Sequence, residues 1–133
     1  MKVFINLEST VTSADGTKDR IPHSGNGMLT CQNSTLRLSF PISGIMQTLI
    51  YDKNTPHHLE LQRGSDRLEF DTSLSETDGR FQTEYFVIFP KIRTHTLRVD
   101  LTESGGSILL SYDLSLEGEI QHFHMEIEVK KTA

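Results

Sequence analysis

The fold is decided by the stretch Ile108-Leu109-Leu110-Ser111-Tyr112-Asp113-Leu114-Ser115-Leu116, which alternates apolar with mostly polar side chains more regularly than any other part of the chain. Successive side chains of a β-strand point to opposite faces, so this period of two predicts a strand with one buried face. Ser104-Gly105-Gly106 before the stretch and Glu117-Gly118 after it predict tight turns.

The same alternation recurs outward from this stretch, and short runs rich in Gly, Asn, Asp and Pro separate its repeats. It predicts about ten short strands and no extended helix. Short connections favour antiparallel neighbours, because parallel pairs need a long crossover. A meander of this kind closes most simply into a barrel, which removes exposed edges. We therefore expect an all-β fold, an antiparallel up-and-down barrel of about 8–10 strands.

Composition is that of an ordinary globular protein. The 133 residues are 35% hydrophobic and 23% charged, which is too apolar for disorder, and their length suits one domain spanning residues 1–133. The formal net charge is −5 and no dense Lys/Arg cluster occurs, so the sequence argues against a nucleic-acid partner.

The N-terminal stretch from Met1 to Glu8 lacks the continuous apolar core of a signal peptide, since Asn6 interrupts it. No segment has the roughly 18 apolar residues of a membrane-spanning helix, so no membrane partner is expected. The single cysteine, Cys31, excludes an intramolecular disulfide. These features together predict a cytoplasmic protein.

The strand pattern also resembles a known family. The stretch from Ile108 to Leu116 is followed by Gly118-Glu119 and His122-Phe123-His124, and preceded by Gln62-Arg63-Gly64, Leu68-Glu69-Phe70 and Glu84-Tyr85-Phe86. This ordering, from about Val3 to Val129, resembles the YwiB-like family of small bacterial proteins, a domain of unknown function. The resemblance implies a calycin-like (lipocalin-like) β-barrel and no established activity.

Five polar side chains are the candidate ligand-binding residues. Simple alternation places them on the apolar faces of their strands, toward the barrel interior, and they are Arg63, Tyr85, Arg93, His95 and Tyr112. A buried arginine is costly unless it is paired, and an arginine with a tyrosine hydroxyl is suited to receive a carboxylate. The sequence therefore predicts that the interior binds a small anionic or amphipathic ligand.

Two alternatives remain open. The chain can instead be a protein-interaction module whose barrel is filled by its own side chains, including Phe70, Phe81, Phe89, Phe123, Leu110 and Leu114. A ligand binder predicts an open cavity of about 300 Å³ or more, whereas an interaction module predicts a filled interior and an exposed apolar patch. An enzyme ranks third, because no nucleophile elbow or phosphate-binding loop occurs. The sequence does not decide whether the chain forms a homodimer.

His122-x-His124-x-Glu126 has the spacing of metal ligands on one face of a strand. Phe123, Met125 and Ile127 alternate with these residues and mark the opposite face as the core face. The pattern is therefore interpreted as a solvated outer face, and no metal or other cofactor is expected.

Overall fold

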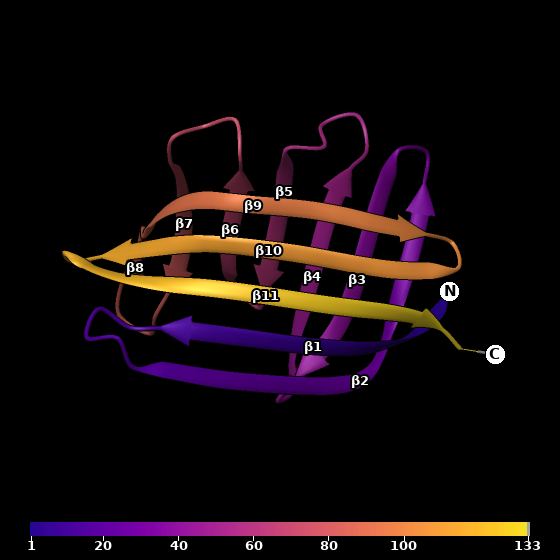
Figure 1. Cartoon of the computed structure of the whole chain (residues 1–133), viewed down its shortest axis with the longest axis horizontal. Helices are drawn as coiled ribbons and strands as arrows, with labels where there is room; N and C mark the ends of the chain where they lie inside the picture. Colours follow the sequence, from indigo (N-terminus) through magenta and orange to yellow (C-terminus); the bar gives the residue numbers. More distant parts are fainter. Residues whose placement is uncertain (133) are drawn as a thin grey trace.

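Eleven β-strands and no helix form in residues 1–132, the part of the chain that this computed structural model describes (Figure 1). Every pairing between neighbouring strands is antiparallel. In chain order the strands are β1 (Lys2–Thr12), β2 (Lys18–Gln32), β3 (Thr35–Ile42), β4 (Ile45–Asp52), β5 (His58–Arg63), β6 (Asp66–Asp71), β7 (Thr77–Gln82), β8 (Val87–Ile88), β9 (Lys91–Thr102), β10 (Gly105–Leu116) and β11 (Glu119–Lys131).

Ten of these strands close into a barrel in the order β6-β5-β4-β3-β2-β1-β11-β10-β9-β7, because β7 pairs with β6 as well as with β9. Strand β8 pairs only with β7 and stands outside this ring. In Figure 1, β1, β9, β10 and β11 cross in front of β3 to β7, so the barrel is flattened into two layers. The predicted antiparallel barrel is confirmed.

The inward apolar side chains of the alternating strands fill the space between the layers. Phe70 and Leu110 are fully buried, and Leu114 is nearly so. Burying such a side chain contributes about 1.5–3 kcal/mol to folding. Phe81 and Phe123 are only half-buried, and Phe89 is exposed, which corrects its expected inward position. The other fully buried large side chains are Ile5, Leu29, Leu38, Leu59, Ile92, Ile127, Val3 and Pro90.

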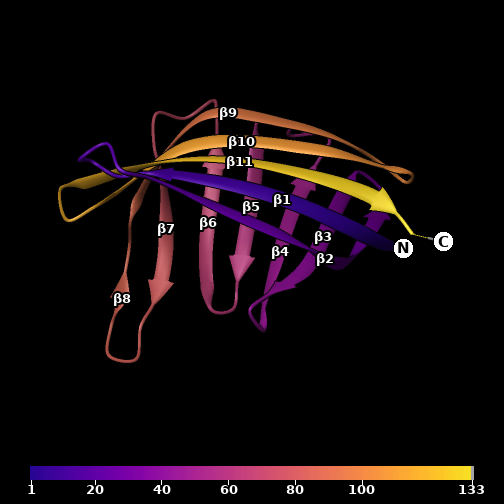
Figure 2. The ribbon, with the colours of Figure 1, turned by 60° about the horizontal axis from the view of Figure 1, so that its bottom comes forward.

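One end of the barrel is less tightly closed than the other. Strand β2 pairs with β1 from Lys18 to Met28, but with β3 only from Met28 to Gln32, so its first part has a free edge. Figure 2 shows the β3–β4, β5–β6 and β7–β8 turns projecting from the back layer, away from the front strands. We call this region the flared end and define it by the half-buried residues Val11, His23, Arg63, Phe81 and Phe123.

Candidate ligand site at the flared end

Arg63 and Tyr112 are the two predicted site residues that face the interior. Both strands keep the expected alternation, since Arg63 follows buried Leu59 and Leu61 on β5, and Tyr112 follows buried Leu110 on β10. The two side chains are near enough for the Arg63 charge to act on the ionisation of the Tyr112 hydroxyl. The structure therefore brings this pair together from opposite layers.

The Arg63 guanidinium has capacity for a further partner. Its central carbon lies 5.8 Å from the centre of the Phe81 ring, a cation–π arrangement. Its ion pair with Asp66 is loose, with 3.8 Å between Nη2 and Oδ2. Because an arginine presents five N–H donors in a planar fork, this placement leaves donors available to an anion.

Tyr112 is held by aromatic rings. The ring of Phe123 stacks on it with 4.8 Å between centres, and the Phe70 ring lies 4.6 Å away at a tilt of 54°. Burial raises the pKa of the Tyr112 hydroxyl to about 12, although the nearby positive charge of Arg63 acts in the opposite direction. The hydroxyl is therefore protonated at neutral pH and can donate a hydrogen bond.

Arg93 and His95 lie on the outer face, so their expected inward orientation is wrong. A β-bulge causes the error: Tyr112 is opposite Thr94 and Ser111 is opposite Thr96, which leaves His95 as an extra residue in β9. Before the bulge, the inward residues of β9 are Ile92 and Thr94. After it they are Leu97, Val99 and Leu101.

Tyr85 is also outside the barrel, in contrast to the expectation that it shares a face with Phe81. It is 85% exposed and lies in the turn between β7 and β8. The Thr83 hydroxyl closes this turn, because it accepts hydrogen bonds from the backbone N–H groups of Tyr85 and Phe86. The strand on which Tyr85 was expected is thus a hairpin of β7 and β8.

A hollow of about 320 Å³ opens at the flared end. Phe81, Leu114 and Leu116 form its apolar wall, and Gln121 adds a polar amide. The Arg63 guanidinium lies over the Phe81 ring, so a positive charge lies next to the apolar wall of the hollow. The exposed carboxylates Glu117 and Glu119 also line the hollow.

Sequence reasoning missed the cluster around Asp113 on the outer face. His95 Nε2 lies 2.8 Å from one carboxylate oxygen of Asp113, and His122 Nδ1 contacts the other. Burial by itself raises the pKa of Asp113, but the hydrogen bonds and positive charge of these histidines outweigh burial and lower it. The bulge that moves His95 outward creates this cluster.

The outer position of His122, His124 and Glu126 agrees with the sequence interpretation. Among the described residues, no three His, Cys, Asp or Glu side chains are placed to hold a metal ion. No helix in that part of the chain is long and apolar enough to cross a membrane.

Comparison with known proteins gives the family. The family described as a domain of unknown function, DUF1934, matches residues 5–128, which is most of the chain. The chain belongs to this family. A solved structure, described as the crystal structure of the ywiB protein from Bacillus subtilis, superposes with a TM-score of 0.80 at 17% sequence identity, covering 98% of this chain and 92% of that one. The expected YwiB-like barrel is confirmed. The comparison with curated proteins finds no match.

Proposed function

We propose that this chain binds a small amphipathic anion at the flared end of the barrel. The observation that carries the proposal is Arg63, which has a loose ion pair and lies over Phe81, where Phe81 forms part of the apolar wall of a hollow. The site differs from the sequence expectation, because the hollow beside Phe81 lies at one end of the barrel and not in its packed interior.

The chemistry of the site suits a carboxylate with an apolar tail. Arg63 can offer two parallel N–H donors to a carboxylate. Phe81, Leu114 and Leu116 offer apolar surface to the tail. Burial of each methylene of the tail contributes about 0.8 kcal/mol. Decanoate combines these features and serves as a probe.

The proposal is tested by calorimetric titration of decanoate into the protein and two arginine variants. We expect Arg63→Gln to weaken binding about tenfold, the loss of about 1.4 kcal/mol. Arg93→Gln is the matched control and should leave binding unchanged, because Arg93 lies on the outer face. Decyltrimethylammonium has the same chain length and the opposite charge, and should bind more weakly than decanoate.

Equal binding of decanoate by the Arg63→Gln variant would contradict the proposal. Equal or tighter binding of decyltrimethylammonium would also contradict it, since Glu117 and Glu119 rather than Arg63 would then govern the site. Circular dichroism and the thermal midpoint of each variant establish that the barrel is still folded.

A protein-interaction role is the second candidate function. The filled interior favours it, as does the exposure of large apolar side chains on the outer face, including Phe86 and Phe89 beside β8. A chain that bound neither amphiphile and still captured a protein partner would favour this candidate over the first.

A further inference from the structure

An apolar groove runs over the outer face of β1 to β4, on the side opposite to the filled interior. Directly opposed residues of antiparallel strands share a face, and the pairing register joins Lys2 to Met28 and Met28 to Ser39. The same register places Pro41 beside Met46. The groove therefore crosses four neighbouring strands.

The groove is open and mostly apolar. It has a volume of about 430 Å³, and its lining includes the side chains of Met28, Pro41 and Met46. Met28 is 47% exposed and Met46 is 51% exposed. Phe4, which is 37% exposed, extends the apolar surface beside Asn26. Flexible methionine side chains adapt well to a bound partner, and a contiguous exposed apolar patch of this kind marks an interaction surface.

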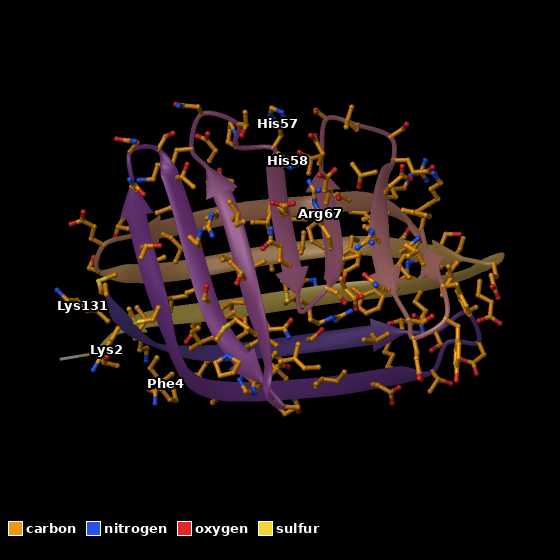
Figure 3. The ribbon with its side chains drawn as sticks, turned by 180° about the vertical axis from the view of Figure 1, so that it is seen from behind. Lys2, Phe4, His57, His58, Arg67 and Lys131 are labelled. Carbon is orange, nitrogen blue, oxygen red and sulfur yellow. The ribbon has the colours of Figure 1, made fainter. Side chains whose placement is uncertain are left out.

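Basic side chains adjoin the groove. Lys2 lines it, and Lys130 is opposite Phe4 on the same face of the sheet. Figure 3 shows Lys2, Phe4 and Lys131 gathered at one end of the barrel. Among the described residues, neither Lys2 nor Lys130 forms an ion pair, and no carboxylate lines the groove. Lys2 is therefore the charged side chain of the groove lining, and a cation lines this groove on a chain whose net charge is −5.

We propose that this groove docks an extended segment of another protein in which acidic and apolar side chains are combined. Apolar side chains of the segment lie against Met28, Pro41 and Met46, and its carboxylates lie beside Lys2 and Lys130. The contacts from Met46 on β4 to Lys130 on β11 cross five neighbouring strands, or about 19 Å, which is the reach of about five to six extended residues.

A second copy of this chain is a poorer occupant. A two-fold symmetric contact through the groove places the same patch on both sides, so that lysines face a surface that carries lysines. Repulsion between these like charges disfavours such a dimer.

The methionine methyl groups provide the test, because the chain has only four methionines. The protein is labelled with ¹³C in these methyl groups and titrated with the blocked peptide Asp-Phe-Glu-Leu-Asp, and separately with Lys-Phe-Lys-Leu-Lys. We expect the acidic peptide to shift the signals of Met28 and Met46 in a saturable way. Met125 is the internal control and should not shift, because it lies on the inner face of β11.

Charge variants test the role of the lysines. We expect Lys2→Glu and Lys130→Glu each to weaken binding of the acidic peptide by about fivefold. Lys18→Glu makes the same change at the exposed start of β2, far along the strand from Met28, and should have no effect.

Several outcomes would overturn the docking proposal. These are no shift at millimolar acidic peptide, equal binding of the basic peptide, or equal binding by the Lys2→Glu and Lys18→Glu variants. Shifts of Met28 and Met46 with decanoate but not with the acidic peptide would overturn it too, since the groove would then take small amphiphiles. A concentration-dependent dimer that protects Met28 and Met46 would also overturn it.

Discussion

The two ends of the barrel have the same strand pattern but different interiors. At the closed end, Val3 and Ile5 on β1 are fully buried, and Val129 opposite Ile5 is nearly so. At the flared end, Val11 on the same strand is only half-buried, as is Phe123 opposite it. The strands are continuous between the two ends, so the difference arises from how neighbouring strands pair around the ring.

This difference separates the packed core from the proposed ligand site. Where β1, β2 and β3 all pair, inward side chains meet across the barrel and fill it. Where β2 does not pair with β3, Val11 and Phe123 are only half-buried, and Arg63 lies over Phe81 beside the hollow. Alternation alone therefore predicts which side chains point inward, but not whether the space that they enter is full.

The largest expected difference comes from truncating one phenylalanine that is fully buried and one that borders the hollow. Phe70→Ala should lower the free energy of unfolding by about 3–5 kcal/mol, because it leaves a cavity in the filled core. Phe81→Ala should lower it by only about 1 kcal/mol, since Phe81 already borders open space. Urea denaturation measures both values, and similar losses would mean that Phe81 is packed as tightly as Phe70.

The next comparison is between two glycines, Gly106 near the start of β10 and Gly118 on the β10–β11 turn. A Cβ on Gly106, at the closed end, would lie 1.8 Å from the backbone oxygen of Asp100, and its φ is +145°. Gly106→Ala should therefore cost about 3 kcal/mol, whereas Gly118→Ala should cost about 1 kcal/mol for its positive φ alone. At Gly118, on the β10–β11 turn, nothing lies within 4 Å of such a Cβ. Thermal unfolding of the two variants would contradict the account if Gly118→Ala were the more harmful.

The pH dependence of the free energy of unfolding tests whether Tyr112 is enclosed by aromatic rings. Its folded-state pKa of about 12 is raised above the ordinary value of 10.0, so the folded state keeps a proton that the unfolded state loses. The stabilisation linked to this proton is complete below pH 10 and is lost as the pH rises toward 12. Wild type should therefore lose about 2 kcal/mol more than Tyr112→Phe between pH 9 and pH 12. Parallel pH dependence of the two proteins would indicate that Tyr112 is not enclosed.

The smallest effect is expected outside the barrel, at Asp113. Its pKa is lowered in the folded state, so the stabilisation is present above its unfolded value near 3.8 and is lost as the pH falls through the lower folded value. Because His95 and His122 are largely exposed, Asp113→Asn should cost less than about 1 kcal/mol at pH 6. The difference from wild type should shrink below pH 4, and a constant difference in acid denaturation curves would rule out the linkage.

The fold could be predicted from the sequence because period-two alternation locates the strands and turn residues locate the connections between them. Tyr112 and Arg63 were oriented correctly, since no bulge lies between them and the apolar residues of their strands. Arg93 and His95 were oriented wrongly. The spacing of two apolar residues on their strand carried a signal of the bulge: Ile92 and Leu97 are both inward but an odd number of positions apart, which requires an inserted residue between them.

Tyr85 could not be placed in the same way. Phe81, Val87 and Phe89 surround it with residues typical of strands, and the Thr83 hydroxyl contacts that form the turn have no distinctive spacing. Whether the interior is filled could not be predicted from the sequence either. It depends on how neighbouring strands pair rather than on the type of any one residue.

The proposed ligand site lies at the flared end, beside Arg63 and Phe81. The most direct measurement is a ¹⁵N-labelled NMR titration with decanoate, followed through backbone amides and the arginine side-chain N–H groups. The account predicts saturable shifts at Arg63, Phe81, Leu114 and Gln121, with the amides of Ile5 and Leu29 unchanged. Shifts centred on the closed end or on the outer face, or no shifts at saturating decanoate, would contradict it.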